Sequence, residues 1–279
     1  MPTIEFDQAK LAYFEVGAGE TVVLLHSSAS SSAQWRSLCA PLAERFTALV
    51  PDLYGYGASD PWPGLAPMTL ADESAPLEAL LARRPGPVHL VGHSYGGAVA
   101  LRLALQSPAR LRSLTLIEPV AFHLLRCGDA GERALYQEIA ALAGSVAAAL
   151  GSGAYWSAME RFVDYWNGAG AFGRIAPDRR IELGRRVGAV ALNFSAAMAE
   201  PVALGTYREI RVPTLLLAGA ASPPTTRRIV ALLAQTLPHA REQVVAGAGH
   251  MLPLTHRDPV NAAILGHLDR QAGRLRAAA

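Results

Sequence analysis

One short stretch, VHLVGHSYGGAVALRLAL (88–105), contains a serine in a setting that could make it a nucleophile. An apolar run leads directly into GHSYG (92–96), and a second apolar segment follows it. This is the G-x-S-x-G pattern between a strand and a helix. So sharp a turn leaves no room for side chains two residues before and after the serine, which explains the two glycines. We therefore predict that Ser94 is a nucleophile at the end of a strand.

A serine hydroxyl needs a neighbouring base before it can attack a carbonyl carbon. Of the eight histidines, His250 has the most suitable position, in a glycine-rich loop after the last predicted strand. Such a loop can reach the edge where Ser94 lies, and the order of serine before histidine is the one that hydrolases use. His256 is the nearest competitor, but it lies closer to the last helix. We expect His93 to be a packing residue that bonds locally and points away from Ser94.

These motifs resemble those of the α/β-hydrolase fold superfamily along nearly the whole chain. The resemblance implies a mostly parallel sheet of eight strands, a helical cap inserted after the sixth strand and a Ser-acid-His triad. Together the motifs are specific for the superfamily and weak for any single activity. The segments that carry the resemblance are LLHSSASSSAQW (24–35), PDLYGYGASD (51–60), GHSYGG (92–97) and GAGH (247–250).

A tetrahedral acyl intermediate needs two hydrogen-bond donors for its negative oxygen, which together form an oxyanion hole. We expect one donor to be the backbone N–H of Tyr95, directly after the nucleophile. In similar proteins the other donor is the third residue of a His-Gly-x loop. This chain has His26, Ser27 and Ser28 there, so the resemblance implies the N–H of Ser28, with serine in place of the glycine. We expect His26 to hold this loop and Asp52 to be structural.

The acid of the triad must orient the histidine ring and stabilise its charged form. Similar chains most often carry it as Gly-x-x-Asp after the seventh strand, but here GAAS (219–222) has no carboxylate. Glu118 stands at the end of the predicted strand 114–118, which corresponds to the sixth strand of the superfamily. Some superfamily members carry their acid there, and leaving a carboxylate unpaired between apolar runs would be costly. We therefore predict Glu118 as the acid. Asp258 is the second candidate, and a Ser-His pair held by Ser222 or water is the third.

The elements that must position these residues alternate along the chain. Several apolar runs are continuous, which indicates strands covered on both faces and hence a mostly parallel sheet. Strands alternating with helices predict an α/β fold, a three-layer sandwich. We predict strands at 12–16, 21–25, 48–50, 88–92, 114–118, 214–219 and 242–245, and helices at 33–43, 69–81, 95–106, 131–150, 179–199, 225–237 and 259–268.

One region interrupts this alternation. Residues 120–206 contain no convincing strand and many alanines and aromatic residues, so we predict a helical cap (lid) over the site. The core domain would then consist of 1–119 and 207–279. The alternative is that this region is simply more helical core. We expect Phe122 and Trp166 to line a substrate pocket, although aromatic side chains on a cap could equally be core packing.

Composition limits the function classes. The 279 residues are 51% hydrophobic and 17% charged with a net charge of +2, which is typical of a globular protein. Without a basic run, a nucleic-acid partner is not expected. We find no signal peptide and no apolar stretch of about 18 residues, which predicts a soluble cytoplasmic protein without a membrane span. The spacing of Cys39 and Cys127 suggests neither metal nor redox site, and a disulfide stays open.

We therefore predict a serine hydrolase that cleaves an ester, thioester or lactone of a small apolar substrate, with no cofactor and no metal. The same residues would support C–C bond hydrolysis, perhydrolysis, acyl transfer or a lyase reaction. Haloalkane dehalogenase and epoxide hydrolase chemistry is disfavoured, because similar enzymes have aspartate as the nucleophile. A non-catalytic receptor or signalling partner that keeps the pocket is the other class. The oligomeric state stays open, with a homodimer as one option.

Overall fold

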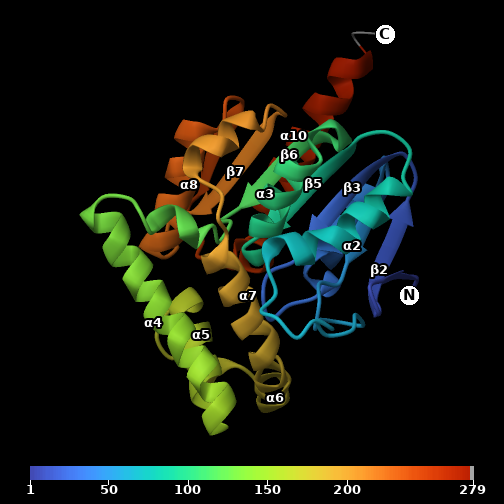
Figure 1. The fold of residues 1–279 in the computed structure, drawn as a ribbon. Helices are drawn as coiled ribbons and strands as arrows, with labels where there is room; N and C mark the ends of the chain where they lie inside the picture. Colours follow the sequence, from blue (N-terminus) through green and yellow to red (C-terminus); the bar gives the residue numbers. More distant parts are fainter. Residues whose placement is uncertain (277–279) are drawn as a thin grey trace.

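Eight strands form one sheet in the computed structural model, which describes residues 1–276 (Figure 1). Their order is β1-β2-β4-β3-β5-β6-β7-β8. The pairs β1–β2 and β2–β4 are antiparallel, and every other pair is parallel. The strands are β1 (Thr3–Phe6), β2 (Ala9–Gly17), β3 (Glu20–Leu25), β4 (Phe46–Pro51), β5 (Val88–His93), β6 (Leu111–Ile117), β7 (Thr214–Gly219) and β8 (Ala240–Val245).

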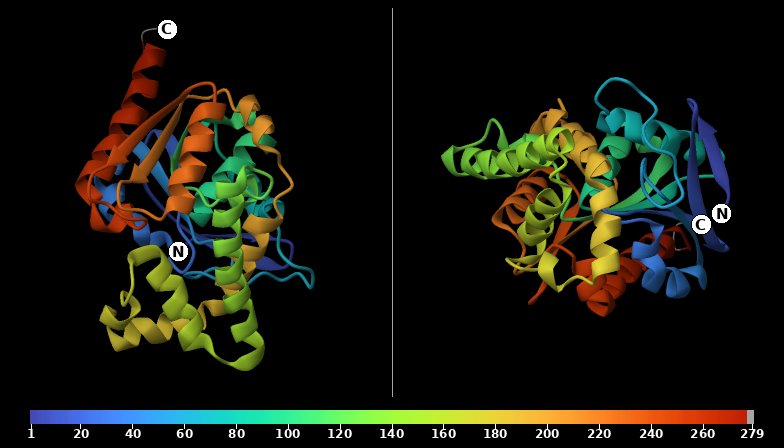
Figure 2. Two further views of the ribbon diagram at one scale, coloured as in Figure 1. Left: turned by 90° about the vertical axis from the view of Figure 1, so that its left-hand side faces the viewer. Right: turned by 90° about the horizontal axis from the view of Figure 1, so that it is seen from below.

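Helices cover both faces of the sheet, which explains why its central strands are continuously apolar. On β3, Val22 and Leu24 pack in one core cluster with helices α1 and α10, while Val23 and Leu25 pack in another with α2, α3 and α8. Figure 2 shows the two helix layers on opposite sides of the strands. These helices are α1 (Arg36–Ala43), α2 (Leu70–Ala82), α3 (Tyr95–Gln106), α8 (Pro224–Thr236) and α10 (Arg257–Arg276).

The sheet and its layers confirm the predicted α/β class, with small differences in the elements. All seven predicted strands are present, and the first strand, β1, was missed because it is a short edge strand with exposed positions. The predicted helix at 179–199 is two helices, α6 (Pro177–Arg185) and α7 (Val187–Ala199). The short helix α9 (Leu252–Thr255) was also not predicted.

All regular secondary structure between β6 and β7 is helical. Besides α6 and α7 it contains α4 (Ala130–Ser152) and α5 (Tyr155–Asn167), and no strand of the described chain lies in it. In Figure 1 these four helices gather at one end of the sheet. The Trp166 ring of α5 stacks on the ring of His250 at 4.2 Å between centroids, so this end is where the loops after the parallel strands lie.

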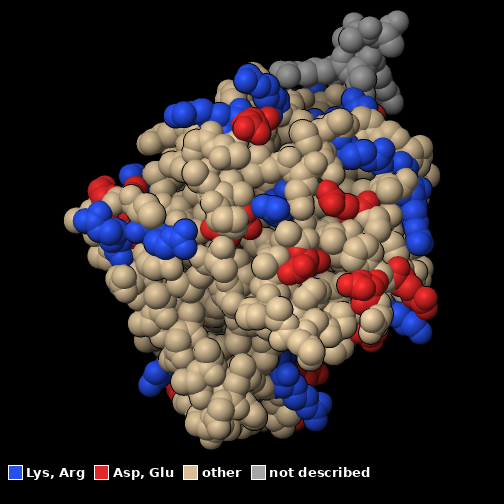
Figure 3. All heavy atoms as spheres, in the orientation of Figure 1, with Lys and Arg blue, Asp and Glu red and all other residues tan. Residues whose placement is uncertain are grey.

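Helix α4 differs from what the sequence led us to expect. By length and composition alone it could cross a membrane, so the expectation that no apolar stretch is long enough was wrong for this helix. Within the structure, however, α4 packs against α5 and α7, and it starts with a capping box between Asp129 and Glu132. Residues 139–159 contain no charged side chain. In Figure 3 the middle of the lower part of the molecule is uncharged, with charged side chains at its left and right edges.

A buried carboxyl group on α2 lies behind the start of α3. Glu73 is completely buried, accepts a hydrogen bond from the Tyr54 N–H at 3.0 Å and another from the Tyr95 hydroxyl at 3.1 Å. Burial raises the pKa of Glu73 to about 7, although both hydrogen bonds act in the opposite direction. The folded protein therefore keeps this proton at pH values where the unfolded chain, with its ordinary pKa of 4.5, has lost it.

We predict that Glu73→Gln removes a pH-dependent part of the stability. The contribution of Glu73 is fully present below pH 4.5 and is lost as the pH rises through about 7. Relative to wild type, the free energy of unfolding of the variant should increase by about 3 kcal/mol from pH 4.5 to pH 8. Urea unfolding of both proteins at several pH values measures this difference. Glu78→Gln, on the same helix but half-buried, is the control, and an equal trend in it would contradict the prediction.

Candidate active site

Ser94 occupies the sharp turn between β5 and α3, with a φ of 56° and a ψ of −116°. This is a strained conformation for a residue other than glycine. A Cβ atom on Gly92 would lie 2.3 Å from the carbonyl oxygen of Gly96, and one on Gly96 would lie 2.5 Å from that of His26. Both positions therefore require glycine, as the motif indicated.

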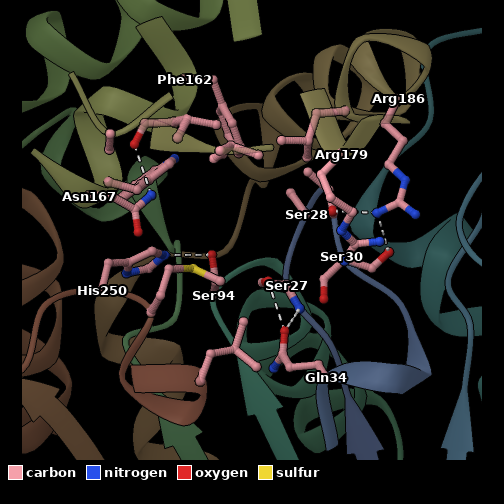
Figure 4. Close-up of a pocket in the computed structure, with 18 of the residues that line it drawn as sticks. Ser27, Ser28, Ser30, Gln34, Ser94, Phe162, Asn167, Arg179, Arg186 and His250 are labelled. Atoms are coloured by element: carbon pink, nitrogen blue, oxygen red, sulfur yellow. Dashed lines mark hydrogen bonds between the residues drawn. The ribbon is translucent and has the colours of Figure 1, made fainter. Parts of the chain in front are cut away.

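Three of the predicted residues meet at this turn. The Nε2 atom of His250 lies 2.9 Å from the Ser94 hydroxyl oxygen, and its Nδ1 atom lies 2.7 Å from an oxygen of Glu118. A carboxylate can only accept, so Nδ1 carries the proton and Nε2 is free to accept one from the serine. The three side chains are at most 5% exposed. Figure 4 shows the hydrogen bond between His250 and Ser94, both of which line a cavity.

Glu118 directly follows β6 and adopts a φ of 43°, in the left-handed region. Its other carboxylate oxygen accepts the Gly219 N–H at 2.7 Å. Burial acts to raise the pKa of Glu118, but the hydrogen bond and charge of His250, the Ser222 hydroxyl and the Gly219 N–H together hold it below its ordinary value. The carboxylate therefore stays charged beside the histidine.

The competing candidates lie elsewhere. Asp258 is exposed in the first turn of α10, and His256 bonds through Nδ1 to the Thr255 hydroxyl at 3.0 Å. Ser222 lies beside Glu118 and does not replace it as the partner of His250. Of the candidates that the sequence left open, Glu118 and His250 are the ones that lie in one hydrogen-bonded chain with Ser94.

His93 behaves differently from its sequence prediction. It does not bond locally, because Gln34 Nε2 donates to its Nδ1 at 3.2 Å and its Nε2 donates to the His250 carbonyl oxygen at 2.9 Å. Burial, together with the nearby charge of His250, lowers the pKa of His93 to about 3, so its ring is neutral. The Oε1 atom of Gln34 in turn accepts from the N–H and hydroxyl of Ser27. His93 thus connects the serine-rich loop to the histidine loop.

The serine-rich loop is held as expected by His26 and Asp52. The ring of His26 bonds to the Ser27 carbonyl at 2.8 Å and accepts the Leu53 N–H at 3.0 Å. Asp52 accepts two further backbone N–H groups of the neighbouring loops. Within residues 1–276, no hydrogen-bond acceptor of the protein lies on the N–H of Ser28 or Tyr95. Both donors are therefore available to a ligand oxygen beside Ser94.

One residue of the helical segment supports this loop and was missed from the sequence. Asn193, on α7, is buried, and its side-chain oxygen accepts from the Ser28 hydroxyl at 2.8 Å and from the Tyr56 hydroxyl at 2.6 Å. A single amide in the otherwise apolar run VGAVALNFSAAMA was the signal that could have identified it.

A cavity of about 490 Å³ opens at Ser94 and His250, with the serine-rich loop on one side and α5 and α6 on the other (Figure 4). Trp166 lines it, as predicted for a pocket residue. Phe122 borders a second, smaller cavity, which Ser94 and Trp166 also border. The aromatic rings of Phe122 and Trp166 are stacked at 6.4 Å between centroids.

Comparison with known proteins shows the family to which the fold belongs. The family model described as the alpha/beta hydrolase fold matches residues 20–257. The chain belongs to the α/β-hydrolase fold family. The resemblance noted on the sequence and the predicted fold class are thereby confirmed.

Individual relatives show how far the similarity extends. RutD of Pantoea ananatis, provisionally named a carbamate hydrolase, is 30% identical over 265 residues, which is 91% of this chain and 90% of RutD. An acetyltransferase component of the acetoin cleaving system of Cupriavidus necator is 37% identical over 121 residues, but these are 42% of this chain and 32% of that protein. The part that matches this acetyltransferase component and three uncharacterised mycobacterial proteins is 32–35% of the length of those relatives. The enol-lactonase structure from Burkholderia xenovorans LB400 has a TM-score of 0.77 at 19% identity and covers 96% of this chain and 99% of that one.

We predict that Asn193→Ala destabilises the protein, because the buried hydroxyl of Tyr56 and the half-buried hydroxyl of Ser28 lose their acceptor at once. The free energy of unfolding should fall by about 1–3 kcal/mol in urea titrations. The control is Asn167→Ala, since Asn167 is exposed and bonds only to the Val163 carbonyl one turn earlier in its own helix. Equal stability of Asn193→Ala and wild type would show that the bonds of Asn193 contribute nothing net.

Proposed function

We propose that the protein is a serine hydrolase that cleaves a carboxylic ester, thioester or lactone through an acyl-enzyme. The observation that carries this proposal is the continuous hydrogen-bonded sequence from Ser94 through His250 to Glu118 in a buried site. Membership of the α/β-hydrolase family supports hydrolysis as the reaction class. The name of RutD also assigns that relative to cleavage at a carbonyl carbon.

The proposed reaction has two halves. His250 Nε2 takes the hydroxyl proton of Ser94 as its oxygen attacks the carbonyl carbon, and the negative oxygen that forms is bound by the N–H groups of Ser28 and Tyr95. His250 then gives the proton to the leaving oxygen or sulfur, which departs. In the second half His250 takes a proton from water as the water oxygen attacks the acyl carbon. The bond from that carbon to the Ser94 oxygen then breaks, His250 returns the proton to this oxygen, and the carboxylic acid leaves. Glu118 holds Nδ1 protonated and stabilises the charged ring throughout.

Two alternatives use the same pocket. A C–C hydrolase or lyase would keep the three residues and differ in its products, so product analysis separates it from an esterase. A receptor would bind but not turn over. A receptor is disfavoured because Glu118 is charged and buried. Burying a carboxylate costs free energy, and a pocket that only binds a ligand has no need of such a group.

We predict that Ser94→Ala has no hydrolytic activity toward p-nitrophenyl acetate and is not labelled by a fluorophosphonate. The substitution removes only the attacking oxygen, so the melting temperature should stay close to that of wild type. Ser157→Ala, an exposed serine on α5, is the control and should keep full activity and labelling. Labelling that persists in Ser94→Ala would place the nucleophile elsewhere.

We predict that Glu118→Gln lowers kcat by a factor of about 10²–10⁴, because the amide no longer fixes the histidine tautomer or stabilises its charged form. Steady-state hydrolysis of p-nitrophenyl acetate measures the change. Glu44→Gln, an exposed glutamate after α1, controls for the loss of one negative charge. Activity of Glu118→Gln near that of wild type would remove Glu118 from the mechanism.

A further inference from the structure

The side-chain amide of Asn193 uses its oxygen in hydrogen bonds but not its nitrogen. The oxygen accepts from the Ser28 hydroxyl at 2.8 Å and from the Tyr56 hydroxyl at 2.6 Å. The nitrogen, Nδ2, is buried and has no hydrogen-bond acceptor among the described residues. The residue as a whole is only 3% exposed. A buried donor without an acceptor costs about 1–3 kcal/mol, so it calls for an explanation.

The Tyr95 hydroxyl does not supply that acceptor. It donates its own proton to Glu73 at 3.1 Å. Burial raises the pKa of this hydroxyl well above its ordinary value, and the Asn193 amide acts in the opposite direction, so the two groups approach one another. Nδ2 nevertheless has no partner at hydrogen-bonding geometry. Because Nδ2 carries two hydrogens, at least one of them remains for another acceptor.

The position of Asn193 indicates what that acceptor is. Asn193 borders the small cavity beside Ser94, and Ser28 and Tyr95, whose backbone N–H groups are the proposed oxyanion donors, border the same cavity. A substrate carbonyl oxygen held by these two N–H groups therefore lies in this cavity. The bond from the Ser28 hydroxyl to Asn193 also brings the amide close to one of the two backbone donors.

The surroundings of this cavity favour a hydrogen bond to a negative oxygen. Away from water, a fixed amide donor stabilises a developing charge more strongly than it would in solvent. The two hydroxyl groups on the Asn193 oxygen hold the amide in place, so it needs little reorganisation when the charge forms. The other walls of the cavity are apolar and consist of Val120, Phe122, Phe162, Trp166 and Phe194.

From this arrangement we propose that Asn193 is a further catalytic residue, whose Nδ2 is a third oxyanion donor contributed by helix α7. This rests on the proposed function and deepens it. An oxyanion forms when Ser94 attacks the substrate and again when water attacks the acyl-enzyme, so Nδ2 acts in both halves of the reaction. The helical segment between β6 and β7 thereby takes part in the chemistry.

Two substitutions separate the donor of this amide from its acceptor. Asn193→Ala removes both, whereas Asn193→Asp keeps an oxygen for the two hydroxyls and, as a charged carboxylate at pH 8, has no hydrogen to donate. Both variants should lower kcat for p-nitrophenyl acetate by about 10²–10³-fold, the usual effect of losing one oxyanion donor. KM should stay within about threefold of wild type, because the lost bond belongs to the transition state. Affinity for a trifluoromethyl ketone, which forms an oxyanion on the attacking serine, should fall by a similar factor.

Asn261→Asp is the control, because Asn261 is half-buried on α10, bonds to the Ser37 carbonyl and borders neither cavity. It should keep the activity and inhibitor affinity of wild type. A folded Asn193 variant of either kind that keeps the kcat of wild type overturns the third donor. Activity in Asn193→Asp alone would show that only the oxygen matters, as a support of Ser28 and Tyr56. Activity in Asn193→Ala alone would show that the loss in Asn193→Asp comes from the added charge.

These outcomes are distinct from failure of the proposed function. If wild type does not cleave p-nitrophenyl acetate and fluorophosphonate does not label Ser94, the hydrolase proposal fails, and this inference fails with it. If wild type cleaves the ester and both Asn193 variants cleave it at the same rate, the hydrolase proposal stands with two backbone oxyanion donors and without Asn193.

Discussion

The hydrogen bond between Glu118 and His250 is the interaction on which the rest of the site depends. It joins two fully buried groups across 132 residues of chain at 2.7 Å. A buried carboxylate without partners would be strongly unfavourable, so β6, β7 and β8 must lie in register for the Gly219 N–H and the His250 ring to reach it. The left-handed backbone at Glu118 is a further cost that this pairing has to offset.

Near the charged Glu118 and its partner His250, the buried imidazole rings of His26 and His93 are neutral. Burial lowers the pKa of His26 to about 4 and that of His93 to about 3, so neither competes with His250 for a proton near neutral pH. Each ring instead uses both nitrogens in hydrogen bonds that hold loops. Three histidines within one small region thus have different tasks, and what separates them is whether a carboxylate bonds to the ring.

The sequence predicted the parts of this structure that depend on local pattern. The continuous apolar runs located seven strands, and the glycines on either side of Ser94 located the turn, because both follow from steric limits within a few residues. Glu118 was found because the loop after β7 lacks a carboxylate. Asn193 stands out as a single amide in a mostly apolar run, but its partner Ser28 lies 165 residues away and could not be predicted from local pattern. The bond from Gln34 to His93, across 59 residues, could not be predicted either. The same holds for His93, whose partners were expected nearby and are distant.

The helices between β6 and β7 build the site as well as covering it. Trp166 from α5 lies flat against the His250 ring, and Asn193 from α7 holds the hydroxyl of Ser28. Phe162 and Phe194, from the same two helices, close the small cavity beside Ser94. A displacement of α5 or α7 would therefore change the surroundings of the His250 ring and of Ser28 together.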